Sequence, residues 1–588
     1  GRVGTTATAT VRLSDLKGIA AHRLVRHIAL GQGLRDPNPL ISSTPQAAPR
    51  ASDRAVGNAH LHKHGAGVLV GIIDVQGFDF SHPDFLDARG RTRFEAIWDQ
   101  GAAHDDSMPD FGYGRVITRM QMDAALAAAP RVGAPAFELE PQSQMVRRSH
   151  GTHVASIAAG NLGVARKAKI AAVLVSLGPD DLDRRRSFYD STRLAHAVTW
   201  LLEQGRMANM PVSINVSLGT NGHAHDSSAP VNRWIDSLLA IPGRSVCVAA
   251  GNAGQERAET PDDVGFVMGR IHTQGQVAAA NLDTDIEWVV AGSVGQVAGG
   301  NGQGIAGAQD YSENELEIWF SPQDKISVSV REPGGKWHGP VCPREFIENR
   351  RIADGSFISI YNELYHPSNG ANYIGVFLSP NMRASPIVGV PAGLWTVRLH
   401  GIEIRDGRYD GWIERDDPAP VQPDPEKPRV WAFPSFFTER SNVDNSSIST
   451  LACGNRVIGV ANLDMSRERI NITSSQGPTR EGRQKPDIAS PGTQIVAANG
   501  FAEPDAPWVA MTGTSMASPY VCGVVALMLA TRPDLTAAQV NGILQRTATP
   551  LPGKGFAWQN DAGFGVINAA NCVREAADVN LRSDRTDA

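Results

Sequence analysis

The sequence has few cysteines, and their spacing suggests no pairing. The five cysteines among 588 residues are odd in number, widely scattered and without a Cys-x-x-Cys spacing, so no disulfide framework can be inferred. Cys247 and Cys522 lie within apolar patterns, where a free cysteine acts as a small hydrophobic residue. This cysteine usage favours a reducing compartment.

The chain also lacks dense basic runs and long hydrophobic runs. With a net charge of −6 and a pI of about 6.3, it gives no support to binding of nucleic acid or of a membrane. Its longest apolar stretch, Val521 to Ala530, is too short to span a bilayer. No charged-then-apolar amino-terminal segment resembles a secretion signal. We therefore expect a soluble protein of the bacterial cytoplasm, or a secreted one if its amino terminus has been processed.

The most informative segment is Gly513–Pro519, with the sequence Gly-Thr-Ser-Met-Ala-Ser-Pro, which precedes an apolar run. A serine hydroxyl is a poor nucleophile unless a base takes its proton and fixed donors stabilise the oxyanion. A glycine turn before a helix exposes Ser515 and directs backbone N–H groups at developing negative charge. Because the same pattern is typical of a simple helix cap, the serine needs partners.

Two other segments supply the partners. The apolar, β-branched run 68–73 predicts a strand buried on both faces, and Asp74 follows it. Functional groups gather at the carboxyl ends of strands in open α/β sheets. Residues 149–160 predict a helix that begins after Ser149, with His150 and His153 in its first turn.

Asp74, His150 and Ser515 follow one another in the order found in subtilisin. In such a triad the acid fixes the imidazole tautomer and the imidazole deprotonates the hydroxyl. Five motifs occur in the order of one family: 72–74, 150–155, 215–219, 249–252 and 513–519. On these motifs the chain resembles the subtilisin-like serine proteases, or subtilases.

The resemblance implies a role for each matched residue. Asp74 would be the orienting acid, His150 the general base and then the general acid, and Ser515 the nucleophile. Asn252 would donate its side-chain amide to the oxyanion hole, together with the backbone N–H of Ser515. A peptide substrate would lie along Ser217, Leu218 and Gly219 as an added strand, and Gly251 would lie near the floor of the first specificity pocket.

One departure from the family pattern affects the turn after the acid. The family usually has a hydroxyl residue and then glycine there, whereas this chain has Val75-Gln76-Gly77. Downstream, the sequence His82-Pro83-Asp84 again fits the family. The departure leaves the turn uncertain but not the identity of the acid.

Each site residue has competitors in the sequence. His150 and His153 face one side of a helix and suggest a metal, but no third ligand is suitably spaced, so we expect no metal there and a supporting role for His153. Ser518 and Thr514 share the turn of the nucleophile, and Asn252 could simply cap a turn. Asp79 and Asp84 do not follow the buried strand directly, which makes them turn or surface acids. The resemblance implies no cofactor for catalysis; structural calcium is common in the family, but no liganding loop can be named.

The fold class predicted is α/β, a subtilisin-like parallel sheet flanked by helices and interrupted by an antiparallel β-sandwich or jelly roll. Helical patterns at 191–203 and 231–239 alternate with short apolar strands, as in a parallel sheet. The predicted organisation is an N-terminal extension, 1–58; a first catalytic part, 59–266; an inserted β domain, 267–430; a second catalytic part, 431–575; and a tail, 576–588. The extension contains a helical pattern from Leu13 to Leu30 and then a Pro/Ser-rich linker.

The inserted segment has strand patterns bounded by turn residues. Residues 326–330 and 395–400 alternate apolar and polar side chains, and 357–361 and 373–378 are aromatic and β-branched. The segment resembles the jelly-roll insertion of Csp-type bacterial subtilases. Its aromatic residues are expected in the core, and the domain would act either as a brace or as a surface for a protein partner or self-association.

The function predicted is that of a serine endopeptidase that hydrolyses peptide bonds of polypeptides through an acyl-enzyme. Two alternatives stay open: a catalytically silent pseudoprotease that serves as a binding scaffold, and an esterase that uses the same triad. The Ser217–Gly219 segment favours an extended peptide over a small ester.

Overall fold

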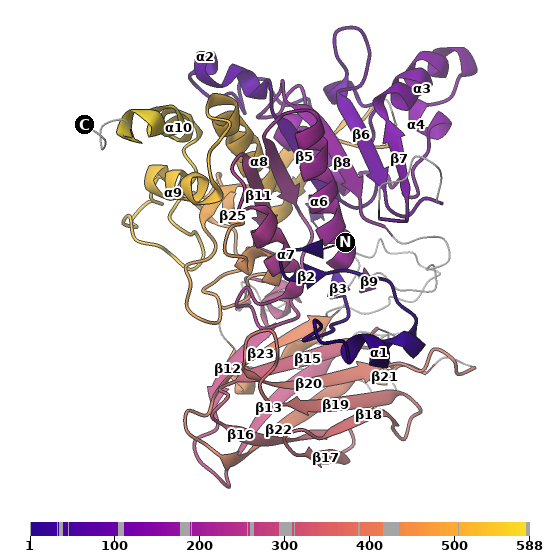
Figure 1. Ribbon diagram of the computed structural model, residues 1–588, viewed down its shortest axis with the longest axis vertical. Coiled ribbons are helices and arrows are strands. Elements are labelled where there is room, and N and C mark those ends of the chain that lie inside the picture. The colour runs from indigo at the N-terminus through magenta and orange to yellow at the C-terminus, as the bar shows by residue number, and fades with distance from the viewer. Residues whose placement is uncertain are drawn as a thin grey trace.

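The computed structural model describes residues 2–583 except 32, 35–38, 45, 104–110, 177–187, 190, 256, 259–263, 293–308, 311, 386–387, 416–433, 444 and 504. The chain forms two parts that lie one above the other in Figure 1. The upper one, the α/β part, contains the long helices and the largest sheet. The lower one, called here the β insert, is formed by the strands between His272 and Phe437.

The α/β part is built on a nine-stranded sheet with the order β26-β25-β11-β10-β5-β8-β6-β7, in which β27 also pairs with β25. Its strands are β5 (Leu69–Asp74), β6 (Phe94–Asp99), β7 (Arg115–Thr118), β8 (Lys169–Leu174), β10 (Val212–Val216), β11 (Arg244–Ala249), β25 (Ile458–Asp464), β26 (Arg469–Ile470) and β27 (Ile488–Pro491). The central strands pair in parallel. All residues of β5 and β10 are buried, which explains their continuous apolar sequences.

Helices cover both faces of this sheet. They are α2 (Ala59–His62), α3 (Arg119–Val132), α4 (Ala136–Leu139), α5 (His150–Ala159), α6 (Ser191–Met207), α7 (Pro230–Leu238), α8 (Thr514–Thr531), α9 (Ala537–Thr547) and α10 (Ala569–Ser583). One hydrophobic core joins α5 and α8 to the sheet, and a second core joins α6 and α7 to its other face. Within the described residues only α8 is long and apolar enough to cross a membrane; 83% of it is buried, so its apolar character reflects its place in the core.

The β insert consists of two antiparallel sheets around a shared core. One has the order β12-β23-β15-β20-β19-β18 and the other β17-β16-β22-β13-β24. The strands are β12 (His272–Gln276), β13 (Asp283–Val290), β15 (Asn314–Phe320), β16 (Lys325–Arg331), β17 (Trp337–Val341), β18 (Phe346–Arg351), β19 (Phe357–Glu363), β20 (Asn372–Ser379), β22 (Gly393–Glu403), β23 (Arg408–Arg415) and β24 (Phe436–Phe437). Apolar side chains from both sheets fill one core. The predicted α/β class with an antiparallel β insertion is therefore confirmed.

The exact domain limits stay predictions. The limit predicted at 430/431 lies outside the described residues. Near the limit predicted at 266/267, a short helical turn, Val264–Gly269, leads into β12.

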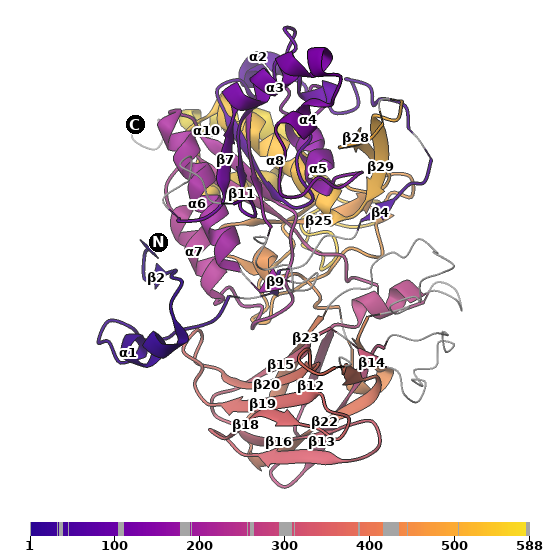
Figure 2. The ribbon, with the colours of Figure 1, turned by 90° about the vertical axis from the view of Figure 1, so that its right-hand side faces the viewer.

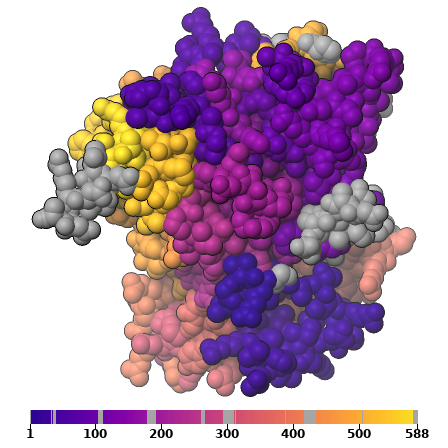
Figure 3. Space-filling model, turned by 45° about the horizontal axis from the view of Figure 1, so that its top comes forward, coloured from indigo at the N-terminus to yellow at the C-terminus, as the bar shows by residue number. Residues whose placement is uncertain are grey.

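The amino-terminal segment lies against both parts of the molecule (Figures 1, 2 and 3), and Figure 2 shows its first residues beside α7. The helix predicted from Leu13 to Leu30 is wrong: after a 3-10 turn, only α1 (Leu16–Ala20) is helical. Leu13, Leu24 and Leu30 are strongly exposed, so their burial does not offset the cost of forming a longer helix.

Short pairings tie this segment to the α/β part. The pair β1 (Arg2–Val3) and β2 (Thr6–Ala7) packs against α7. Next, β3 (Gly33–Leu34) pairs with β9 (Phe188–Tyr189). Finally β4 (Leu40–Ile41) joins the hairpin of β28 (Ile495–Ala498) and β29 (Trp508–Thr512).

In the β insert, β14 (Gln309–Asp310) pairs with β21 (Val390–Pro391).

Candidate active site

Asp74 and His150 form a buried hydrogen-bonded pair. Asp74 is the last residue of β5 and His150 the first residue of α5, whose N-cap Ser149 accepts the backbone N–H of Thr152. The Nδ1 of His150 lies 2.7 Å from the Oδ1 of Asp74, and both side chains are almost completely buried. Since a carboxylate accepts, Nδ1 carries the proton, and the ring presents Nε2 as a base. Among the residues described, this Nε2 has no hydrogen-bond partner.

The unusual turn after Asp74 is stabilised by its own residues. Gln76 has a left-handed φ of 68°, and its side-chain Oε1 accepts the backbone N–H of His150 at 3.0 Å. Gly77 has a φ of 93°, and a Cβ there would lie 2.3 Å from the carbonyl oxygen of Gln144. The turn therefore needs glycine at 77, and Gln76 caps the helix that carries the histidine. No local sequence pattern indicates this role of Gln76.

Ser515 lies in the first turn of α8 and is 3% exposed. Three residues before it, β29 ends at Thr512. The hydroxyl of Ser217 donates to the carbonyl oxygen of Ser515 at 3.3 Å. Asn215 links this contact to the helix, because its amide donates to the Ser217 hydroxyl at 2.9 Å and accepts from the Ser518 hydroxyl at 2.6 Å. Ser518 is thus engaged in holding the turn, as is expected of a supporting residue.

Asn252 contacts the residue immediately before the serine. Its Oδ1 accepts from the backbone N–H of Thr514 at 3.0 Å and from the Thr514 hydroxyl at 3.1 Å. With the oxygen engaged, the amide nitrogen is the atom of this side chain left to bind a ligand. It lies near Gly513, at whose position a Cβ would be 3.4 Å away. Thr514 also accepts the backbone N–H of Gly251 at 3.2 Å.

The sheet register brings these two clusters to one edge. Ile73 of β5 pairs with Val216 of β10, and Val216 pairs with Val248 of β11. The residues that follow these positions, Asp74, Ser217 and the Gly251–Asn252 turn, therefore emerge from neighbouring strand ends. Because α5 packs against α8, the helices that carry His150 and Ser515 are also neighbours. No hydrogen bond joins Ser515 to His150 within the described residues.

His153 is a structural histidine. Its Nε2 lies 3.1 Å from the carbonyl oxygens of both Ile495 and Val509, on the two strands of a hairpin. Complete burial lowers the pKa of His153 to about 3, so the ring is neutral and acts as a donor. Within the described part of the chain, no group of three or more His, Cys, Asp or Glu residues that could hold a metal is found. Calcium therefore has no assigned place.

The alternative carboxylates have structural partners. Asp79 accepts the backbone N–H of Phe501 at 3.0 Å and the hydroxyl of Ser81 at 2.6 Å. Asp84 accepts from the hydroxyl of Ser156 at 2.6 Å and is 2% exposed. Both acids are buried, so neither is a surface acid. Asp79 does lie in a turn, as predicted, because its carboxylate accepts the backbone N–H of Ser81. Each acid satisfies buried donors that would otherwise be unpaired. Neither contacts His150.

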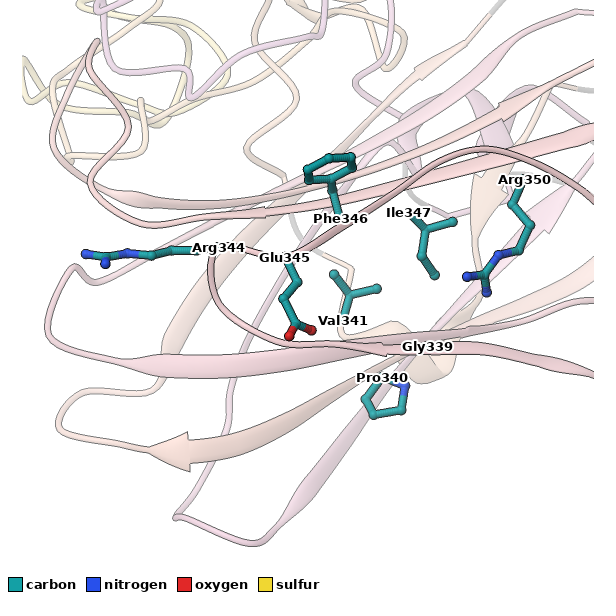
Figure 4. Close-up of a pocket in the computed structure, with 8 residues that line it drawn as sticks. All are labelled: Gly339, Pro340, Val341, Arg344, Glu345, Phe346, Ile347 and Arg350. Atoms are coloured by element: carbon teal, nitrogen blue, oxygen red, sulfur yellow. The ribbon is translucent and has the colours of Figure 1, made fainter.

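A groove in the β insert lies apart from the residues of these two clusters. It has a volume of about 490 Å³ and is lined by residues 339–350 of the β insert. Figure 4 shows Phe346, Ile347 and Arg350 on its β18 side and Gly339 and Pro340 on its β17 side. Strands β17 and β18 are edge strands of the two different sheets, so the groove lies between the two sheets at one edge of the sandwich.

The fold and the strand-end cluster define a protein of the subtilisin type, and the comparisons agree. The model of the subtilase family, Peptidase S8, matches residues 65–373 and 437–565. The chain belongs to the subtilase family, and it is a subtilisin-like serine protease, a hydrolase. The family predicted from the sequence motifs is confirmed.

Particular relatives are similar over different lengths. Serine protease AprX of Bacillus subtilis (strain 168) is 31% identical over 332 residues, which cover 50% of this chain and 72% of AprX. An extracellular protease of Xanthomonas campestris is 40% identical over 94 residues, which cover 15% of this chain and 16% of that protein. The structure of the Clostridium perfringens CspB protease superposes with a TM-score of 0.67 at 22% identity, over 90% of this chain and 97% of that chain. That likeness concerns the fold.

The comparisons do not support the predicted cytoplasmic location. Two relatives, from Xanthomonas campestris and Bacillus subtilis, are named as extracellular proteases. The reducing compartment was inferred from unpaired cysteines, and all five cysteines are free in the structure. Four of them are buried, and a buried thiol is a packing residue in any compartment. The free cysteines therefore do not identify the compartment, and the predicted preference for the cytoplasm has no support.

Proposed function

We propose that this protein is an endopeptidase that cleaves polypeptides with Ser515 as nucleophile, His150 as base and Asp74 as orienting acid. The observation that carries the proposal is the buried Asp74–His150 hydrogen bond of 2.7 Å, which leaves Nε2 of the ring without a partner among the residues that the structure describes. A base held in one tautomer at the sheet edge where α8 begins, with Ser515 in the first turn of that helix, fits acyl transfer.

The proposed chemistry uses these groups one after another. Ser515 attacks the carbonyl carbon of the scissile bond while His150 takes the hydroxyl proton. Asn252 and the backbone N–H of Ser515 donate to the oxyanion. His150 next protonates the leaving amine, and water repeats the cycle on the acyl-enzyme.

The proposed substrate lies along Ser217, Leu218 and Gly219 as an extended strand. Two features support this placement. The segment leaves the sheet directly after Val216, where β10 ends, and the Ser217 hydroxyl contacts the turn of Ser515. Gly251 has a φ of 109°, and a Cβ there would lie 2.7 Å from the Ser475 hydroxyl oxygen, which supports its place at the floor of the first specificity pocket.

Digestion of a peptide library with the wild-type chain and with Ser515→Ala tests the proposal. We expect internal cleavage by the wild type and none by the variant. A wild type that leaves every peptide intact yet hydrolyses a small ester would indicate the esterase alternative. A wild type inert toward both would indicate the pseudoprotease, for which the intact residues Asp74, His150, Asn252 and Ser515 give no support.

A further inference from the structure

Carboxylates of the β insert contact the segment that follows the proposed substrate-binding strand. Glu414 of β23 accepts two hydrogen bonds through Oε2: one from the hydroxyl of Thr220, at 3.1 Å, and one from the backbone N–H of Asn221. Glu414 is 7% exposed. Thr220 is the residue immediately after Gly219, so Glu414 contacts the chain directly beside the proposed substrate-binding strand. Glu414 itself is 194 residues from Thr220 and 193 residues from Asn221 in the sequence.

A second carboxylate, on the neighbouring strand, extends this contact. The Oε2 of Glu317 in β15 accepts the backbone N–H of His223 at 2.8 Å and the indole N–H of Trp319 at 2.9 Å. Burial raises the pKa of Glu317 to about 7 and raises that of the adjacent Glu315 further above its usual value. Glu315 and Glu414 are directly paired across β15 and β23.

This arrangement is costly for a purely structural contact. Buried acids that face one another destabilise a fold unless they satisfy specific donors. The donors satisfied here are two backbone N–H groups and one hydroxyl of residues 220–223. The acids thus hold the loop of residues 220–223 in place by accepting its N–H and O–H groups, which an apolar interface could not do.

The loop needs such support because its backbone is strained. His223 and His225 have left-handed φ values of 75° and 48°, a conformation that is unfavourable for residues other than glycine. The ring of His225 stacks on Trp412 of β23, with centroids 4.3 Å apart, and its nitrogens lie 2.8 Å from the carbonyl oxygens of Asn221 and Ile448.

The α/β part holds the other side of the same loop. The backbone N–H of Thr450 donates to the carbonyl oxygen of Thr220 at 2.9 Å. The side-chain hydroxyl of Thr450 donates to the carbonyl oxygen of Gly222 at 2.6 Å. The loop is therefore fixed between residue 450 and the two strands of the insert.

We propose that Glu414 and Glu317 are positioning residues that fix the Ser217–Gly219 strand for binding of an extended peptide. The proposal rests on the function proposed above for that strand. It gives the β insert a part in substrate binding: the acids do not touch the substrate, but they determine where the strand that binds it lies.

The test compares Glu414→Ala, Glu414→Gln and Thr220→Val with the wild type and with the control Glu403→Gln. Glu403 is an exposed acid of the same insert, paired with Lys325. Steady-state kinetics would be measured on an eight-residue peptide and on a small ester. The rate of fluorophosphonate labelling of Ser515 reports the catalytic groups alone.

We expect Glu414→Ala to raise KM for the peptide about tenfold, as the loss of hydrogen bonds to a charged acceptor implies. Its kcat, its ester hydrolysis and its labelling rate should stay within about twofold of the wild type. Glu414→Gln keeps an acceptor and should recover most of the peptide affinity. Thr220→Val should show a smaller rise of KM, and Glu403→Gln none.

Two results would overturn the proposal: an unchanged peptide KM in Glu414→Ala and Thr220→Val, or an equal loss of ester hydrolysis and labelling, which would mean general destabilisation. If Glu414→Ala does not fold, the peptide KM of Thr220→Val decides in the same way. Failure of the proposed function gives a different result, since the wild type itself would then show neither labelling nor peptide cleavage.

Discussion

His153 should make the fold sensitive to acid in a measurable way. The ring is fully buried, and burial lowers its pKa to about 3, whereas an imidazole in the unfolded chain titrates near 6.5. Between these two values the unfolded chain binds the proton and the folded chain does not. Stability from this residue is therefore present above about pH 6.5 and is lost as the pH falls toward 3.

The size of the effect follows from the two pKa values. Each pH unit within this window is worth about 1.4 kcal/mol, so the free energy of unfolding should fall by about 2 kcal/mol between pH 7 and pH 5. His153→Gln keeps an N–H donor for the carbonyl oxygens of Ile495 and Val509 but has no proton to gain. The variant should therefore lack this contribution to the fall in the free energy of unfolding between pH 7 and pH 5.

The measurement is urea unfolding of both proteins at pH 7 and pH 5, followed by circular dichroism. Other buried groups, such as His225, whose pKa burial lowers to about 4, titrate in both proteins and cancel in the difference. Equal losses of stability in the wild type and His153→Gln would show that His153 does not titrate as a buried neutral ring, and the reasoning would be refuted.

Three further predictions concern the site and its surroundings. Asn252→Ala should lower kcat about a hundred- to a thousandfold, the loss seen when one oxyanion-hole donor is removed from subtilisin; an unchanged kcat would place the oxyanion elsewhere. Gly77→Ala should reduce both Tm and kcat, because its Cβ would lie 2.3 Å from a carbonyl oxygen, whereas Gly90→Ala, with a similar φ of 71° and open space, should leave kcat unchanged; equal kcat in the two variants would contradict this. Leu34→Ala should cost about 3 kcal/mol of stability by chemical denaturation, since Leu34 is fully buried against the α/β part; no loss would mean that the amino-terminal segment is not docked.

Much of the site was predictable because its residues follow strong local patterns. A buried apolar run leads into Asp74, Ser149 caps the helix of His150, and a glycine turn precedes Ser515. The structure has these as β5, α5 and α8. Within the β insert, the predicted strands at 326–330 and 395–400 appear within β16 and β22.

Other features depend on distant partners and carried no local signal. Glu315 and Glu317 alternate with apolar residues in β15, a pattern that predicts a solvated face. That face is covered by residues 220–225 of the α/β part. The prediction for 13–30 failed for the opposite reason: the segment has an apolar helical spacing, but Leu13, Leu24 and Leu30 remain exposed in the part of the chain that the structure describes.

The role of Gln76 in capping the helix of His150 also had no local signal in the sequence. A residue with a left-handed φ is expected to be glycine or asparagine, so glutamine gave no indication of a turn. Its place is fixed by the hydrogen bond to the backbone of His150, 74 residues later. Such contacts are set by the tertiary fold.

The central claim, that Ser515 is the nucleophile activated by the Asp74–His150 pair, is tested most directly by mapping a fluorophosphonate adduct by mass spectrometry. We predict a single adduct on the peptide that contains Ser515, and its loss in His150→Ala. An adduct on another serine of an active preparation, or labelling of Ser515 that persists undiminished without His150, would contradict the account.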